Sequence, residues 1–417
     1  MNKALLVDFG ATHIKSVVYD VFDEQHSDFR KVSTPQNTSK ISGEFTVSHE
    51  QLTKIFEDIC ESYKFHKYEA VFISSQMHGF VVADKNNNPL TDYISWQDQR
   101  GPIVELDKFR EITGMKSRIG LPVYNLHHMV NTQKVFNQKI KIMTLPDLLA
   151  NISGKSENMT HNSMLASTGF YDVNHEQISP HISDLFECDL MFNSGTPEIE
   201  VAGYYNNIPI YTGVGDLQSA TYGAVNADLE SILVNIGTGS QVSRISETKE
   251  APSGIEYRPY IGKNHLHTVT HIPAGRALSA YLSLFSELGV DCWEKIKHYT
   301  HKEIANSTLE IDFAIFESAA GYADGGSIKG ITENNFNIDN ILTSLINNLV
   351  QQYVQYIDKI DCNNDLNWVI LSGGIPRNIP ALSTLMTSYA QKSCIVHCSA
   401  IDETLHGLSK IARNHAT

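Results

Sequence analysis

The chain has 417 residues, of which 41% are hydrophobic and 19% charged, so it is a folded globular protein with room for two or three domains. Its formal net charge of −15, without clusters of Lys and Arg, argues against a nucleic-acid partner but not against ATP, whose phosphates need only local donors. No apolar run approaches the roughly 18 residues of a membrane span, and the N-terminal segment reaches Asp8 and Gly10 too early for a signal peptide, so we expect a cytoplasmic protein without a membrane partner.

The N-terminal segment KALLVDFGATHIKSVVYDV predicts a β-hairpin. Strands are expected over Ala4–Val7 and Ile14–Tyr19, joined by a tight turn that contains glycine. Asp8, Thr12 and Lys15 lie around the bend of this hairpin.

An amphipathic helix and a buried strand follow the hairpin. Ser48 and Gln51 stand at capping-box spacing, which predicts the start of the helix. Apolar residues then recur at helical intervals, at Leu52, Ile55, Phe56, Ile59 and Tyr63. The strand AVFIS comes next, and the polar motif SQMHG follows it directly.

Two later motifs resemble binding loops but lack a required residue. SGKS at 153–156 ends like a phosphate-binding loop, but Leu149 stands where that loop requires its first glycine. The segment from Asp84 begins like a calcium loop, but it has Pro89 where the sharp turn needs Gly and Ser95 where a bidentate Glu is needed. We therefore predict no phosphate-binding loop at 153–156, and a hairpin turn rather than a calcium site after Asp84.

A single carboxylate stands between glycines and a helix of small residues near the end of the first half. The buried strand IPIYTGVG is predicted to lead into Asp216, and the helix LQSATYGA follows it. Asp216 is placed to cap this helix, which would use one carboxylate oxygen and leave the other for a ligand.

The segment SILVNIGTGSQVSRI repeats the plan of the first hairpin, so the two halves of the chain are predicted to share one template. Its bend holds Asn235, Gly237, Thr238, Gly239 and Ser240. The run GTGSQV lacks the last glycine of a dinucleotide-binding fingerprint, which removes the main support for a Rossmann oxidoreductase.

The second half ends in another alternation of helix and strand. Apolar spacing from Ile338 to Tyr353 predicts a long amphipathic helix before the strand WVIL at 368–371. A Gly-Gly turn follows, and Pro380 is expected in the first turn of another helix. A ligand can approach the backbone closely at such a turn and meet the positive end of a helix dipole.

The six cysteines are scattered without a C-x-x-C pair, so we expect them to be reduced. The cluster CIVHC at 394–398 contains three metal-ligand side chains. A buried strand is the favoured interpretation, because a closed zinc site needs four convergent ligands.

The order and spacing of six motifs resemble those of the FGGY carbohydrate kinases, in the actin/Hsp70/sugar-kinase superfamily. The motifs are DFGATHIK, SSQMHG, SWQDQR, GVGDLQSATYGA, NIGTGSQVS and LSGGIPRN. The resemblance extends to DETLHGLSKIA at 402–412, which is similar to the closing helix of the family. SQMHG and its neighbours resemble the sedoheptulokinase and xylulokinase branch. The chain is shorter than most members, which predicts trimmed surface elements or a reduced lid.

The resemblance implies an α/β fold of two ribonuclease-H-like domains of the actin-like ATPase type, with a cleft between them. Residues 1–226 would form the N-terminal FGGY domain, with the sugar site, the catalytic Asp and the first phosphate hairpin. Residues 227–417 would form the C-terminal FGGY domain, with the second phosphate hairpin and the adenosine site.

The activity implied by the resemblance is transfer of the γ-phosphoryl group of ATP to a hydroxyl of a small sugar, with Mg²⁺ as cofactor. The acceptor would be a ketose such as a heptulose or pentulose, Asp216 the general base, and Asp8 the metal-binding residue, usually through water. ATP would be bound by Asp8, Gly10, Thr12, Lys15, Gly237, Thr238, Gly239, Ser240, Gly373, Gly374 and Asn378. The sugar would be bound by Gln76, Met77, His78, Trp96, Asp98 and Asp216.

Each assignment has a structural alternative. Asp8 could be a turn-forming residue, Asn378 an N-cap, and Arg100 a member of a surface ion pair. Trp96 could pack in a core, and His78 could be a satisfied structural histidine.

Two other functions stay open from the sequence. One is a kinase of the same family acting on a small metabolite other than a sugar. The other is a nucleotide-dependent switch of the actin or Hsp70 type. The sequence leaves the oligomeric state open, a homodimer included.

Overall fold

The computed structural model describes residues 1–101, 113, 118–133, 136, 139–181, 185–225, 228–237, 239–287, 289–317, 322–323 and 325–416. The chain forms two compact α/β units. Unit 1 comprises Met1–Asn226, Arg258–His265 and Ile401–Thr417, and unit 2 comprises Ala227–Tyr257 and Leu266–Ala400. Residues 401–417 thus group with unit 1, whereas the single boundary placed after residue 226 assigned them to the C-terminal domain.

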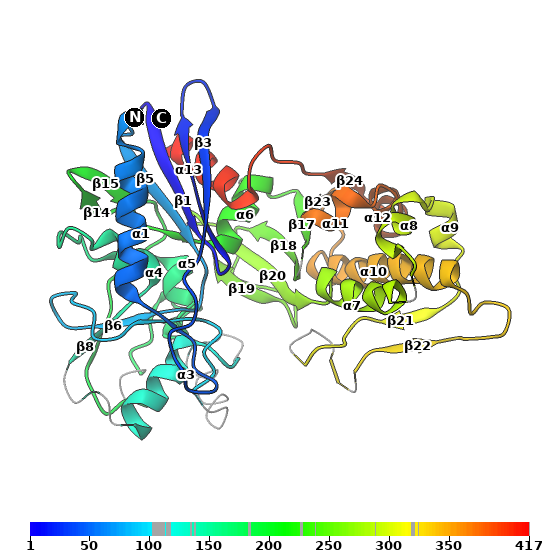
Figure 1. The fold of residues 1–417 in the computed structure, drawn as a ribbon, viewed down its shortest axis with the longest axis horizontal. Coiled ribbons are helices and arrows are strands. Elements are labelled where there is room, and N and C mark those ends of the chain that lie inside the picture. Colours follow the sequence, from blue (N-terminus) through cyan, green and yellow to red (C-terminus); the bar gives the residue numbers. More distant parts are fainter. Residues whose placement is uncertain are drawn as a thin grey trace. The chain divides into compact units, whose positions relative to one another are not determined.

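Unit 1 is built on a mixed sheet in the order β14-β15-β5-β1-β2-β3, and β16 also pairs with β5 (Figure 1). The strands of this sheet are β1 (Lys3–Phe9), β2 (His13–Asp20), β3 (Gln25–Ser33), β5 (Ala70–Ser75), β14 (Val201–Tyr205), β15 (Ile208–Tyr211) and β16 (Val214–Gly215). The helices of unit 1 are α1 (His49–Ser62), α3 (Pro122–His127), α4 (Leu145–Ala150), α5 (Asn162–Ala166), α6 (Asp216–Val225) and α13 (Glu403–Ala416), with a 3₁₀ turn at Lys64–His66 and a π turn at His128–Thr132.

The described part of unit 1 also contains short strands. They are β4 (Thr46–Val47), β6 (Val81–Ala83), β7 (Tyr93–Ile94), β8 (Ile140–Met143), β9 (Met159–His161), β10 (Tyr171–Asp172), β11 (Gln177–Ile178), β12 (Leu190–Met191) and β13 (Ser194–Thr196). They pair as β4-β7, β10-β11, β13-β9 and β12-β8-β6.

Unit 2 contains a second sheet, in the order β19-β20-β18-β17-β23-β24, and a small β21-β22 ribbon. Its strands are β17 (Ser231–Ile236), β18 (Ser240–Ser246), β19 (Glu256–Pro259), β20 (His265–Ile272), β21 (Glu310–Asp312), β22 (Ser327–Lys329), β23 (Trp368–Ser372) and β24 (Ser393–Val396). Its helices are α7 (Gly275–Ser286), α8 (Cys292–His298), α9 (His301–Ala305), α10 (Ile338–Ile360), α11 (Gly374–Asn378) and α12 (Ala381–Ala390).

The two sheets repeat one arrangement, as the internal similarity of the sequence predicted. In unit 1, β1 pairs antiparallel with β2 and parallel with β5. In unit 2, β17 pairs antiparallel with β18 and parallel with β23. Both predicted hairpins are therefore present, and each has a parallel strand beside its first strand.

Helices cover both faces of the unit 1 sheet. Leu5 and Val7 of β1 share a core with Phe56 of α1, and the Ser48 side chain caps α1 by accepting a hydrogen bond from the Gln51 amide, as predicted. Residues of α13 cover the other face, where the His415 ring contacts Phe72 of β5 edge to face. The alternation of side chains along a strand explains this two-sided burial.

A close contact between α6 and α13 accounts for the grouping of the C-terminal helix with unit 1. A Cβ atom on Gly407 would lie 1.8 Å from the Ser219 carbonyl oxygen, so only glycine fits at this crossing. The Ser219 hydroxyl donates to the Thr404 carbonyl at 2.9 Å, and the Lys410 ammonium donates to the Gly223 carbonyl at 2.6 Å.

The core of unit 2 forms around the predicted long helix, which extends to Ile360. Leu345, Leu349 and Tyr353 of α10 are fully buried against the sheet residues Ile232 and Val234. At the C-terminal end of α10, the Lys392 ammonium lies 2.7 Å from an Asp361 oxygen in a buried ion pair.

The segment after Asp84 and the CIVHC cluster have clear outcomes in the structure. The Asp84 carboxylate accepts hydrogen bonds from the amides of Asn86 and Asn88, which confirms a turn after β6. CIVHC overlaps β24, but β24 is an edge strand and Ile395 is 49% exposed, so the prediction of a buried strand is wrong. The described residues contain no group of three or more His, Cys, Asp or Glu side chains placed to hold a metal ion.

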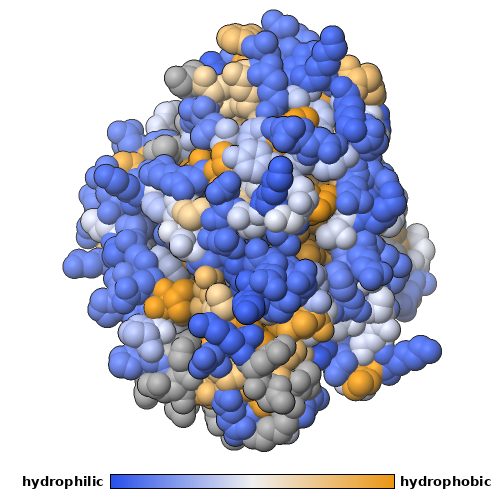
Figure 2. All heavy atoms as spheres, turned by 90° about the vertical axis from the view of Figure 1, so that its left-hand side faces the viewer, coloured by the Kyte–Doolittle hydropathy of each residue, from blue (hydrophilic) through white to orange (hydrophobic). Residues whose placement is uncertain are grey.

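The face of the molecule in Figure 2 is mostly hydrophilic, with hydrophobic side chains in small separate spots. Single exposed apolar residues of this kind are ordinary on folded proteins. In the part of the chain that the structure describes, no helix has the length and apolar character that crossing a membrane requires.

Candidate active site

The carboxyl ends of three parallel strands meet at one edge of the unit 1 sheet. β1 and β16 both pair parallel with β5, and both Asp8 and Val214 align with Ser74. Strands lie about 4.8 Å apart, so the residues at the ends of β1 and β16 are separated by roughly two strand spacings. This topology brings Asp8, the SQMHG motif and Asp216 together, although they are far apart in sequence.

Asp8 is a buried carboxylate with one unused oxygen. It is 2% exposed, and its Oδ2 lies 3.4 Å from the Lys15 ammonium. Among the described residues, no group forms a hydrogen bond with its buried Oδ1. Burial raises the pKa of Asp8 to about 7, against the opposing effect of Lys15. A buried carboxylate with an unmatched oxygen indicates a missing partner rather than a simple turn residue.

Magnesium fits this carboxylate. Mg²⁺ prefers oxygen ligands and commonly takes only one or two protein carboxylates, keeping water and substrate phosphates as its other ligands. Asp8 Oδ1 is such an oxygen, buried and without a hydrogen-bond partner among the described residues.

Lys15, near the N-terminus, contacts Asp402, near the C-terminus, within unit 1. Its ammonium lies 2.7 Å from an Asp402 carboxylate oxygen, besides the longer contact with Asp8. Burial by itself would lower the pKa of Lys15, but the two carboxylates raise it above its usual value. Lys15 is therefore held by two acids, and a phosphate would have to compete with them.

Asp216 is the first residue of α6. The predicted strand before it is interrupted: β15 ends at Tyr211, and only Val214 and Gly215 continue as β16. Asp216 Oδ1 accepts a hydrogen bond from the Leu217 amide at 2.8 Å. Burial raises the pKa of Asp216, partly offset by that amide and by the charge of Arg258. One carboxylate oxygen thus serves the helix, as the sequence suggested.

The SQMHG motif packs directly beside Asp216. A Cβ atom on Gly215 would lie 2.6 Å from the Met77 sulfur, so Met77 covers this glycine. The Gln76 amide donates to the Phe9 carbonyl at 2.9 Å, which fixes the motif to the end of β1.

His78 has a left-handed backbone, with φ 62°, and a defined ring orientation. Its Nδ1 donates to the Ser167 carbonyl at 2.7 Å, which leaves Nε2 as the acceptor, and Nε2 contacts the Arg118 guanidinium. The ring is therefore fixed by Ser167, and its other nitrogen is paired with a cation.

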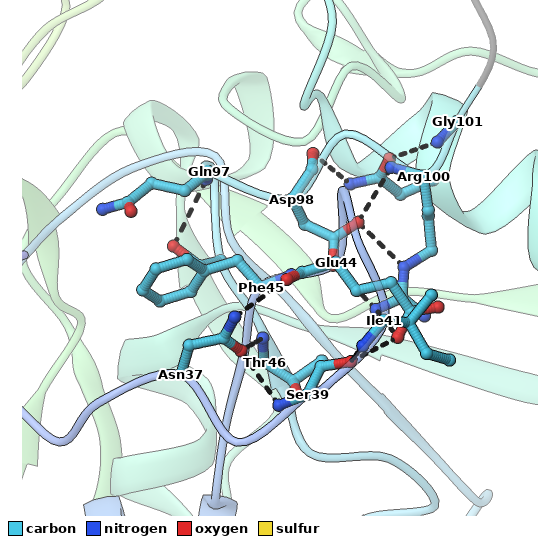
Figure 3. A network of polar contacts seen from close by, with 12 residues as sticks. Asn37, Ser39, Ile41, Glu44, Phe45, Thr46, Gln97, Asp98, Arg100 and Gly101 are labelled. Carbon is cyan, nitrogen blue, oxygen red and sulfur yellow. Dashed lines mark hydrogen bonds and ion pairs between the residues drawn. The ribbon is translucent and has the colours of Figure 1, made fainter.

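The SWQDQR motif contains an exposed ring, Trp96, and an ion pair between Asp98 and Arg100, which Figure 3 shows. Trp96 is 43% exposed, so core packing does not explain it. Asp98 is fully buried, and Arg100 donates to both of its oxygens, at 2.8 and 2.7 Å, while the Phe45 amide donates to Oδ2 at 2.7 Å. Arg100 also lies 3.5 Å from a Glu44 oxygen and is 10% exposed, so the ion pair of the alternative is present but is mostly buried rather than at the surface.

The bend of the second hairpin, in unit 2, is shaped by backbone groups. The Gly237 amide donates to the Gly239 carbonyl at 3.1 Å, and the Gly275 amide at the start of α7 donates to the Gly237 carbonyl at 3.0 Å. The Ser240 hydroxyl donates to the Asn235 carbonyl at 2.7 Å. Thr238 lies outside the described residues.

The Gly-Gly turn of unit 2 lies beside the same bend. Gly373 has φ 95°, and a Cβ atom there would lie 2.4 Å from the Ile236 carbonyl oxygen, so this position requires glycine. A Cβ atom on Gly374 would have no neighbour within 4 Å, which leaves this residue open to a ligand. Asn378 is the last residue of α11 and its side chain donates to the Gly374 carbonyl at 2.8 Å, so the N-cap alternative is wrong.

A family model for the N-terminal domain of the FGGY family of carbohydrate kinases matches residues 3–223, more than half of the chain. The chain belongs to this family. The family prediction, based on the motifs and their order, is therefore confirmed.

Individual relatives agree with the FGGY assignment. A xylulose kinase of Lactococcus lactis subsp. lactis is 24% identical over 316 residues, which are 68% of this chain and 59% of the relative, so the chain spans less than two thirds of that protein's length. The structure of a xylulose kinase from Rhodospirillum rubrum superposes with a TM-score of 0.84 and 12% identity, covering 100% of this chain and 90% of the other. That of a gluconate kinase from Lactobacillus acidophilus gives 0.82 and 15%, covering 99% and 89%. These structures support the fold of two actin-like domains.

Two residues of this FGGY protein were not among the predicted site residues. One carboxylate oxygen of Asp402 contacts Lys15, and the other accepts a hydrogen bond from the Thr404 amide at 3.1 Å. The sequence signal for this residue was its place at the start of a predicted helix, where an acid is a common cap. The Gly275 amide donates a hydrogen bond to the Gly237 carbonyl at the bend. In the sequence, the only local sign of this contact was the Ala-Gly pair at the start of α7.

Proposed function

We propose that the chain is an ATP-dependent kinase that transfers the γ-phosphoryl group to a hydroxyl of a small ketose. The observation that carries the proposal is the placement of Asp216 at the same sheet edge as Asp8, with one oxygen bound to the Leu217 amide. A part-buried carboxylate with a raised pKa is suited to accept a proton from a substrate hydroxyl.

In the proposed reaction, the protein positions the two substrates and stabilises charge. Asp8 would hold Mg²⁺ through Oδ1, and the bound ion would neutralise phosphate charge. The backbone at Gly237 and Gly239 would lie along the phosphates, and Gly374 would border the adenosine. Asp216 would accept the proton of the acceptor hydroxyl as the new P–O bond forms and the bond from the γ-phosphorus to the β,γ-bridging oxygen breaks, with ADP as the leaving group.

The acceptor is assigned from the residues around Asp216. Gln76, Met77 and His78 are in the proposed sugar site because Met77 packs against Gly215. The exposed ring of Trp96 offers a flat apolar surface to a carbon skeleton. Asp98 stabilises the SWQDQR motif rather than facing a ligand, because Arg100 and the Phe45 amide donate hydrogen bonds to both of its oxygens.

The test is a phosphoryl-transfer screen with Mg·ATP over pentuloses, heptuloses, hexoses, gluconate, glycerol and amino-acid amides. We expect the highest kcat/KM with a pentulose or heptulose. Faster transfer to glycerol or to an amide would overturn the choice of a ketose while leaving a kinase. ATP hydrolysis that is unchanged by every acceptor would instead support a switch of the actin or Hsp70 type.

A further inference from the structure

The residue before Asp216 is held by a buried side chain from another part of unit 1. Ser163, in the first turn of α5, is fully buried, and its Oγ accepts a hydrogen bond from the Gly215 amide at 3.2 Å. Because Gly215 is covalently joined to Asp216, this bond acts on the position of the proposed base. Such buried bonds fix a backbone where few other contacts do.

The direction of this contact depends on His161. Ser163 Oγ accepts from Gly215, and its own proton is directed to His161 Nδ1 at 2.8 Å. The Ser163 amide also donates to Nδ1, at 3.2 Å, so Nδ1 is an acceptor. His161 Nε2 donates to the Pro197 carbonyl at 3.1 Å, which fixes the tautomer of the ring.

The surroundings keep the ring in this state. Burial lowers the pKa of His161 to about 4, so the ring is neutral near pH 7. A protonated ring would donate from both nitrogens and would remove the acceptor that orients the Ser163 hydroxyl.

Gly215 has a short strand ladder, although side chains pack closely against one side of it. β16 pairs with β5 over Val214 and Gly215 only, so its ladder is short. On the side where a Cβ atom would point, Met77 and the Gln218 amide oxygen lie within 2.6 Å of that position, so the segment is closely packed there.

We propose that His161 and Ser163 are positioning residues for phosphoryl transfer, which act on Asp216 through the Gly215 amide. The inference rests on the proposed role of Asp216 as the base. It adds two residues that act at a distance from the reacting atoms and that none of the quoted motifs contains.

The test compares four single variants of the full chain and one double variant. Ser163→Ala removes the hydroxyl, and His161→Leu removes its acceptor. His161→Gln keeps an acceptor oxygen and a donor N–H. Tyr68→Phe is the control, because Tyr68 is also buried in unit 1 and its hydroxyl donates to the Cys60 carbonyl at 2.9 Å, before β5 begins and away from Gly215.

We expect Ser163→Ala and His161→Leu to lower kcat by roughly 10- to 100-fold, with the KM for Mg·ATP nearly unchanged, because a displaced base slows the chemical step. His161→Gln should retain most of kcat. Combining Ser163→Ala with His161→Leu should cost little more than Ser163→Ala alone, since both break one chain of contacts. Amide hydrogen exchange at Gly215 should rise in Ser163→Ala and stay normal in Tyr68→Phe.

Wild-type kcat in Ser163→Ala, or an equal loss in Tyr68→Phe at the same change in Tm, would overturn the inference. Unchanged exchange at Gly215 in Ser163→Ala would also overturn it, even in a chain without measurable turnover. Failure of the proposed function is distinct, because it would appear as a wild-type chain that transfers phosphate to no acceptor.

Discussion

The two hairpin bends share a position in their sheets but differ in chemistry. In unit 1, Asp8 and Lys15 flank the bend and Asp402 joins them, so the bend is charged. In unit 2, the described residues of the bend are Gly237, Gly239 and Ser240, which contribute amides and a hydroxyl. In the proposed reaction, one architecture would supply ionisable groups for metal binding and proton transfer in one unit, and neutral backbone groups for phosphate in the other.

The largest effect on turnover should come from Asp216→Asn, at the sheet edge of unit 1 that also holds Asp8. Asn has nearly the same shape and can still accept the Leu217 amide, but it cannot take a proton. We expect kcat to fall by at least about 100-fold, within the range for general-base catalysis. Steady-state kinetics with Mg·ATP and the best acceptor measure this loss.

The same variant separates catalysis from helix capping. Its Tm should stay within about a degree or two of wild type, and nucleotide binding should be nearly normal. Retained turnover with unchanged stability would exclude Asp216 as the base.

Acid should destabilise unit 1 through His161. The pKa of this residue is about 4 in the folded chain and 6.5 when exposed, so the unfolded chain binds more protons between these values. The contribution of neutral His161 to the free energy of unfolding is therefore fully present above about pH 6.5. It is lost as the pH falls toward 4, and the loss is at most about 3 kcal/mol. Urea unfolding of the wild type and His161→Gln over pH 4 to 7 measures the difference between the two curves. Parallel curves would contradict this assignment.

Local patterns in the sequence predicted most elements of both sheets. The first hairpin, α1 with its Ser48 cap, and α10 follow from alternation, capping and helical spacing, which depend on neighbouring residues. The resemblance to the FGGY kinases placed Asp8, the SQMHG motif and Asp216 in one site. The parallel pairing of β1 and β16 with β5, which the sequence analysis did not use, brings them to one sheet edge.

What the sequence did not predict depends on contacts between distant segments. Lys15 and Asp402 are 387 positions apart, and Ser163 reaches Gly215 across 52 positions. The exposure of β24 depends on its place at the edge of the sheet, which its own residues do not encode. The full occupation of Asp98 likewise arises from Phe45 and Arg100 together, one of them far away in sequence.

The Gly-Gly turn beside the neutral bend of unit 2 offers a test of the proposed nucleotide site. Gly374→Leu places a side chain where the free protein has open space, so the chain should fold normally and lose nucleotide affinity by about tenfold through crowding. Gly373→Ala is the matched variant, because its φ of 95° and the nearby Ile236 carbonyl should make it lose stability instead. Calorimetry with Mg·ADP and thermal unfolding distinguish the two, and equal affinity in Gly374→Leu and wild type would remove Gly374 from the site.

The smallest effect on kinetics is expected from replacing His78, which lies in unit 1 and belongs to the proposed sugar site. Alanine is a poor replacement by itself, since φ 62° disfavours it, whereas Asn tolerates this backbone and can still donate a hydrogen bond. His78→Asn should therefore keep the fold and lose the ring nitrogen Nε2 that faces Arg118. We expect the KM for the acceptor to rise a few-fold, as for the loss of one hydrogen bond of roughly 0.5 to 1.5 kcal/mol, while the KM for ATP stays within about twofold. A larger rise in the KM for ATP than for the acceptor would place His78 on the nucleotide side and remove it from the proposed sugar site.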